Sequence, residues 1–132
     1  MEYIVAAESD IGIAKSVNQD SLCVKVAETE LGNAALLLIC DGMGGLAMGE
    51  LASAEVVQSF SEWFENEFPK HLRNFDREDI ARQVAELLSS LNEKLITYGE
   101  ANRLTMGTTA TGMIIFNQQY LSFHVGDTRI YK

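Results

Sequence analysis

Apolar and polar residues alternate near the start of the chain in the way that a β-strand with one buried face requires. The alternation runs from Ser21 to Ala27, with the two-residue period of a half-buried strand. The run from Ala34 to Cys40 is more uniformly apolar and predicts a buried strand. Gly32-Asn33 predicts a hairpin turn between the two. A further strand is predicted from Tyr3 to Glu8.

The middle of the chain carries the spacing of two amphipathic helices. The first helix is predicted before Pro69 by apolar residues at helical intervals, namely Ala52, Val56, Phe60 and Phe64. Asp76 can cap the second helix, and its first turn is acidic. The apolar stripe of this second helix is Ile80, Val84, Leu87, Leu91, Leu95 and Tyr98.

Strand patterns return after the helices. Thr108 to Phe116 and Tyr120 to Val125 predict a hairpin around Asn117-Gln118-Gln119, and Arg129 to Lys132 predicts the start of another strand. Strands, two helices and again strands indicate an α+β fold with the helices on one face of a sheet. We predict a single domain over residues 1–132.

Composition narrows the classes of function. The chain has 132 residues and a net charge of −9, and no Lys/Arg cluster that could neutralise phosphates. We therefore expect no nucleic acid and no membrane among its partners. Neither a spanning helix nor a signal peptide is indicated, and Cys23 and Cys40 are expected to be buried free thiols. The expected compartment is the cytoplasm.

One segment carries candidate chemistry, because Asp41-Gly42 ends the apolar run and Gly44-Gly45 follows closely. A strand that ends in Asp-Gly places a carboxylate beside a backbone carbonyl, and glycine lets a ligand approach the main chain. Hard cations such as Mg²⁺ and Mn²⁺ prefer these oxygen ligands. A tight turn after a strand, with Asp41 capping the loop, is the alternative interpretation.

Three further segments accompany Asp41-Gly42 in a defined order: Ser9 to Ser21, Met106 to Gly112, and His124 to Arg129. Together they resemble the first half of the bacterial-type PPM (type 2C) metal-dependent serine/threonine protein phosphatases, from about Tyr3 to the last residue. The resemblance implies the N-terminal half of an α/β-β/α sandwich, in which antiparallel β-sheets are flanked by helices.

The resemblance also implies roles for individual residues. Asp41 and Gly42 match metal positions of a centre that holds two Mg²⁺ or Mn²⁺ ions and activates a water. Asp20 matches the acidic position beside the metals, and we predict Asp41 and Asp20 as the catalytic pair. Asp127 matches the aspartate linked to a third ion. A turn residue bonded to the following amides is the alternative for Asp127.

Two positions depart from the family pattern. Gln19 stands where members commonly carry glutamate, which touches the metals through water. Lys15 stands where the family has its phosphate-binding arginine, so phosphate would be held by a point charge without a bidentate fork. A solvated lysine at a strand end is the alternative for Lys15. His124, which alternates with apolar neighbours, is expected to pack in the core.

Family catalytic domains are about twice as long, and the aspartates that complete their metal centre have no counterpart here. We expect this segment to be inactive alone, and its implied partner is a phosphoprotein substrate. A non-catalytic regulatory or interaction module that retains the half-fold is the alternative function. Because the resemblance implies strands that pack on a second half, we also expect the chain to self-associate, most simply as a dimer.

Overall fold

The computed structural model describes residues 12–18, 22–43, 46–103 and 106–129. Its elements are, in chain order, the strands and helices β1 (Gly12–Asn18), β2 (Leu22–Thr29), β3 (Gly32–Met43), α1 (Leu46–Asn66), the 3-10 helix η1 (Phe68–His71), α2 (Arg77–Asn102), β4 (Gly107–Phe116) and β5 (Gln119–Arg129). The strand expected from Tyr3 to Glu8 lies outside the described residues.

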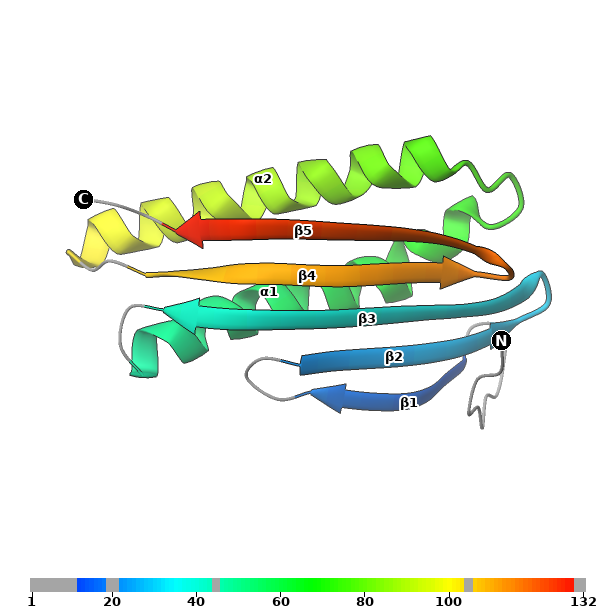
Figure 1. The fold of residues 1–132 in the computed structure, drawn as a ribbon, viewed down its shortest axis with the longest axis horizontal. Coiled ribbons are helices and arrows are strands. Elements are labelled where there is room, and N and C mark those ends of the chain that lie inside the picture. The colour runs from blue at the N-terminus through cyan, green and yellow to red at the C-terminus, as the bar shows by residue number, and fades with distance from the viewer. Residues whose placement is uncertain (1–11, 19–21, 44–45, 104–105, 130–132) are drawn as a thin grey trace.

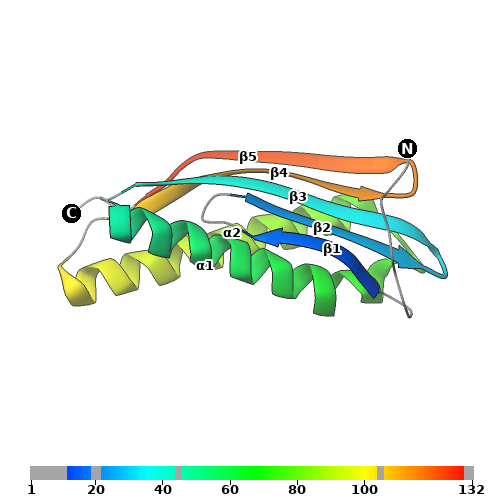
Figure 2. The same ribbon diagram turned by 90° about the horizontal axis from the view of Figure 1, so that it is seen from below.

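The five strands form one antiparallel sheet whose spatial order is the chain order (Figure 1). Helices α1 and α2 are inserted between β3 and β4, which are nevertheless neighbours in the sheet. Both helices lie on the same side of the sheet (Figure 2). The predicted α+β arrangement, with its helices on one face of an antiparallel sheet, is therefore confirmed.

Strand β3 has one buried and one exposed face, although its sequence is almost uniformly apolar. Leu36, Leu38 and Cys40 are fully buried on the helix side, whereas Leu37 and Ile39 are 39% and 58% exposed. The sequence predicted a buried strand, and on the face opposite the helices this holds for Ala35 but not for Leu37 and Ile39. The reason is that helices cover a single side of the sheet.

The helices pack on the sheet mainly through aromatic side chains. Phe60, Phe64 and Phe68 are fully buried, and the Phe64 and Phe68 rings stack with centroids 5.4 Å apart. Phe60 stacks on Phe123 of β5 at 5.3 Å. The helical stripe predicted for α1 is thus confirmed as the centre of the core.

Helix α2 begins at the predicted cap, since the Asp76 side chain accepts a hydrogen bond from the Glu78 amide at 3.1 Å. Its apolar stripe is buried at Ile80, Val84, Leu91 and Leu95 and partly buried at Leu87. The stripe then continues at Gly99, and Tyr98 is 43% exposed. The prediction for Tyr98 was wrong because both three- and four-residue steps fit a helical period, and the buried face here takes the four-residue step.

The first hairpin turn lies two residues earlier than predicted, and the second is one residue shorter than predicted. The first turn is Glu30-Leu31, because Thr29 already pairs with Gly32, which opens β3 at a φ of +139°. The second contains only two residues, since Phe116 pairs with Gln119. The first turn was predicted at the wrong residues because turn composition alone does not determine strand register.

Strand β5 runs without interruption to Arg129. The strand predicted to start at Arg129 is therefore wrong at its first residue, which ends β5, and the rest of it lies outside the described residues. No helix among the described residues is long and apolar enough to cross a membrane.

An ion pair between a buried lysine and an exposed glutamate joins the sheet to α1. Lys25 of β2 points toward the helices, is only 5% exposed, and pairs with Glu65 of α1. A lysine buried this deeply requires a partner, because an unpaired charge in such a place is strongly destabilising. The pair therefore tethers α1 to β2 near the C-terminal end of the helix.

Cys23 and Cys40 are buried free thiols, as predicted. Burial raises the pKa of the Cys40 thiol from about 9 to about 12; the nearby Cys23 adds to the shift, and a hydrogen bond with Thr108 opposes it. The folded protein therefore keeps the Cys40 proton to a higher pH than the unfolded chain does.

This difference predicts a loss of stability at alkaline pH. Between pH 9 and 12 the unfolded chain releases the Cys40 proton and the folded chain retains it, so the free energy of unfolding falls as the pH rises. Urea unfolding at several pH values should show a shallower decline in Cys40→Ala than in the unchanged protein. Equal slopes would contradict the burial of this thiol.

Candidate functional site

The C-terminal end of β3 and the start of β4 lie side by side at one end of the strands. We call this end of the sheet the Asp41 edge. Asp41 pairs with Thr109 and Gly42 with Thr108. The end of β5 reaches the same edge, at the left of Figure 1. Sequence motifs that are far apart in the chain therefore meet here because the sheet is antiparallel.

A β-bulge shapes this edge. Thr108 pairs with Thr128 and Ala110 with Val125, so Gly126 and Asp127 together stand opposite Thr109. The backbones of Asp41 and Asp127 thus flank Thr109 on the two neighbouring strands, about 10 Å apart at normal strand spacing. Bulges commonly occur beside active sites, where they redirect a side chain.

Threonine hydroxyls fix the backbone around Asp41, whose side chain is exposed. The Asp41 amide donates a hydrogen bond to Thr109 Oγ1 at 3.1 Å. Thr108 is fully buried, and its hydroxyl donates to the Thr109 carbonyl at 2.8 Å. The hydrogen bond between Asp41 and Thr109 depends on the β3–β4 register, in which the two residues pair.

Gly42 lies directly against the first turns of α1. A Cβ atom built on Gly42 would stand 2.0 Å from the carbonyl oxygen of Gly49 and 2.7 Å from its Cα. The Gly49 carbonyl in turn accepts a hydrogen bond from Ser53 Oγ at 3.0 Å. The contact is between two main chains, so only glycine at position 42 permits it.

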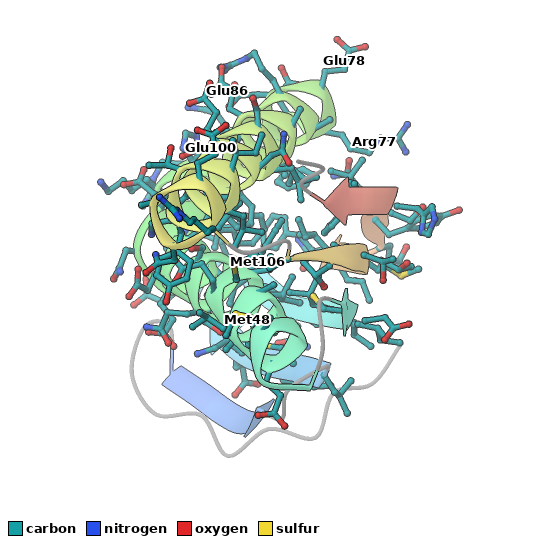
Figure 3. All side chains as sticks on the ribbon, turned by 90° about the vertical axis from the view of Figure 1, so that its left-hand side faces the viewer. Met48, Arg77, Glu78, Glu86, Glu100 and Met106 are labelled. Carbon is teal, nitrogen blue, oxygen red and sulfur yellow. The ribbon has the colours of Figure 1, made fainter. Side chains whose placement is uncertain are left out.

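A small apolar cluster supports the edge from the helix side. Ala52, Leu95 and Met106 are buried together, and Met48 packs against them. Met48 and Met106 lie at this end of the molecule, between the helices and the sheet (Figure 3). The start of α1 is therefore held both by Gly42 and by this cluster.

The remaining predicted site residues are Lys15, Gln19 and Asp20. Gln19 and Asp20 lie outside the described residues. Lys15 in β1 stands opposite Val26, which pairs with Ala35; Ala35 precedes Asp41 by a distance of about 20 Å along β3. The described backbone thus brings Asp41, Gly42 and Asp127 to one edge and leaves Lys15 farther along the sheet.

His124 is exposed, so the expectation of a packed core histidine was wrong. Its Nδ1 and Thr111 Oγ1 are 2.7 Å apart in a hydrogen bond on the face opposite the helices. The apolar neighbours in sequence are not its neighbours in space, because alternate residues of a strand point to opposite faces.

The potential metal ligands at this edge are of the chemical types that a hard cation binds. They are a carboxylate and backbone carbonyls, the ligand types that Mg²⁺ and Mn²⁺ take. Within the described side chains, no three of His, Cys, Asp or Glu gather closely enough to hold an ion. Asp41 and Gly42 could therefore supply part of a coordination shell, which for Mg²⁺ needs six ligands.

Comparison with known proteins points to one family. The profile of the protein phosphatase 2C family matches residues 13–132. A Streptococcus pyogenes protein described as protein phosphatase 2C-type is 27% identical over 128 residues, which are 96% of this chain and 48% of that protein. No solved structure shows a significant match.

Two further relatives carry more specific names. The serine/threonine protein phosphatase PstP of Mycobacterium tuberculosis is 29% identical over 126 residues, which cover 96% of this chain and 22% of PstP. The serine/threonine phosphatase stp of Listeria monocytogenes is 28% identical over 102 residues, 75% of this chain and 38% of stp. The chain thus spans about half or less of the length of these relatives.

The contact between Gly42 and Gly49 generates a prediction for stability. Gly42→Ala should lower the free energy of unfolding by about 1–3 kcal/mol, because its new methyl group meets main-chain atoms that cannot rotate away. Asp41→Asn is the matched control: it changes the exposed neighbouring side chain isosterically and should stay within about 0.5 kcal/mol. Urea denaturation measures both, and equal stability of the two variants would refute the close packing.

Proposed function

Because this chain belongs to the protein phosphatase 2C family, we propose that it provides part of the metal and phosphate site of a serine/threonine protein phosphatase. The observation that carries the proposal is the convergence of Asp41, Gly42 and Asp127 at one sheet edge. The phosphoprotein substrate and the cytoplasmic location expected from the sequence belong to the same proposal.

We assign the residues as follows. The Asp41 carboxylate and the Gly42 carbonyl are ligands of Mg²⁺ or Mn²⁺, Asp20 acts with Asp41 in catalysis, and Asp127 serves a further ion. Lys15 attracts the phosphate, and Gln19 contacts the centre through water. Bound at this edge, the ions supply positive charge that polarises a water molecule and the phosphoryl oxygens.

The chain's own contribution is to hold its oxygen ligands in place before substrate arrives. The bond from the Asp41 amide to Thr109 Oγ1 fixes the backbone of the principal ligand. The close packing of Gly42 on the main chain of Gly49 would hold the Gly42 carbonyl, a proposed ligand, in place. Such preorganisation is what electrostatic stabilisation of a transition state requires.

A non-catalytic module remains the second candidate function. It is favoured by Lys15 and Gln19, the two departures from the family pattern. A module of this kind would retain the fold and bind a partner without hydrolysing phosphate.

Phosphatase activity distinguishes the two candidates. We expect the 132-residue chain to show little or no turnover of p-nitrophenyl phosphate, because the family resemblance implies further aspartate ligands that have no counterpart in these residues. A longer polypeptide that contains this segment should hydrolyse it with Mn²⁺, and Asp41→Asn should lower kcat at least about 100-fold, since a lost ligand removes several kcal/mol of stabilisation. A folded longer polypeptide without such activity would favour the module.

Metal binding tests the site separately from turnover. Calorimetric titration of the chain with Mn²⁺ should show one weak event that disappears in Asp41→Asn. Glu28→Gln is the matched control, because Glu28 is an exposed carboxylate that pairs with Asn33 at the opposite end of β3. Tight binding of two ions that survives Asp41→Asn would mean that the site lies elsewhere.

A further inference from the structure

A network of hydrogen bonds connects the end of α1 to the start of α2, at the end of the molecule opposite the Asp41 edge (Figure 1). Its centre is the side-chain amide of Gln83 on α2. The indole Nε1–H of Trp63 on α1 donates to Gln83 Oε1 at 3.1 Å. Gln83 Nε2 donates to Asp79 Oδ2 at 3.1 Å and lies 3.1 Å from Nε2 of His71 in η1. One amide thus links three elements.

The partners of Gln83 determine which ring nitrogen of His71 carries the proton. An indole N–H only donates and a carboxylate only accepts, so the Gln83 amide has a single possible orientation. Its Nε2 therefore faces the imidazole, and Nε2 of His71 must accept the hydrogen bond. The ring proton consequently lies on Nδ1, which is 3.6 Å from Asp79 Oδ2. The network holds His71 as the neutral Nδ1–H tautomer.

The charged groups around His71 come from η1, the residue before it, and α2. Those that form ion pairs there are Glu67, Lys70, Asp79, Arg82 and Glu86. Of these, Asp79 faces the imidazole, and Arg82 binds the other oxygen of the Asp79 carboxylate. On α1, Glu62 and Glu65 bind other side chains of their own. The carboxylate with which a protonated His71 would pair is therefore Asp79.

We propose that this corner is a pH-sensitive connection, in which protonation of His71 releases Gln83 and thereby frees the Trp63 indole. An imidazolium donates from both ring nitrogens, so its Nε2–H would point at the hydrogens of the Gln83 amide. Turning the amide over does not relieve the conflict, because Oε1 would then face the Asp79 carboxylate and Nε2 would face the indole N–H. Gln83 must therefore move away, while the imidazolium pairs with Asp79.

The release affects a buried group of α1. Trp63 is only 8% exposed, and its N–H loses its acceptor when Gln83 moves. A buried donor without a partner is destabilising, so the contact of α1 with the start of α2 loosens on acidification. The proposal uses no residue of the Asp41 edge and is independent of the proposed phosphatase function.

The test follows one indole and one imidazole by NMR, because the chain has one tryptophan and two histidines. In His124→Asn the remaining imidazole is that of His71, and His124 is an exposed residue bonded to Thr111 on the other face of the sheet. Histidine changes its charge between about pH 5 and 8. Across this range, the ring signals of His71 and the Nε1–H signal of Trp63 should shift with the same midpoint.

Two further variants separate a relay through Gln83 from a general effect of acid. In His71→Asn the indole shift should disappear. In Gln83→Leu the imidazole should still titrate, but the indole signal should no longer follow it. Circular dichroism establishes that each variant is folded. If either of these two does not fold, the midpoints of the two signals in His124→Asn still decide.

Three results would overturn the proposal. An indole signal that stays constant while the His71 ring titrates would show that Gln83 keeps its place. An indole shift that persists in His71→Asn would mean that another group titrates. An indole shift of full size in Gln83→Leu would mean that the charge of His71 acts on Trp63 directly, without the amide between them.

Discussion

The burial of one face of β3 against α1 is the interaction on which the rest of the structure depends. Leu36, Leu38 and Cys40 are fully buried in the same cluster as Phe60 and Phe64. Each large apolar side chain of this kind contributes about 1.5–3 kcal/mol when buried. Because β3 is also the central strand, its position sets the register of both β2 and β4.

The candidate site is a direct consequence of this packing. Because Cys40 is buried against the helices and successive residues of a strand point to opposite faces, Asp41 lies on the exposed side. Gly42 then meets Gly49 where α1 begins. The core therefore determines where the Asp41 carboxylate lies, and the main-chain contact beside it limits the movement of the edge.

The two sides of the sheet differ in their polarity for the same reason. The helix side buries aromatic rings and Lys25, which pairs with Glu65, and its outer surface carries most of the negative charge. The opposite face keeps Leu37, Ile39 and Tyr120 accessible. A half-covered sheet of this kind gains stability when a second layer removes the remaining apolar surface from water.

Local signals in the sequence determined the kinds of element and their order. The stripe of α1, the Asp76 cap of α2 and the Asp-Gly pair at the end of β3 depend on residues a few positions apart, and the structure has all three. The family motifs likewise predicted Asp41 and Gly42 as candidate ligands.

Only the tertiary structure decided the features that depend on distant residues. The Glu30-Leu31 turn and the β5 bulge opposite Thr109 follow from strand register, which a single residue can shift without changing composition. The exposure of His124 depends on which face the helices cover. The contact of Gly42 with Gly49 requires a helix to pack on a strand end, and no local pattern records the distance between two main chains.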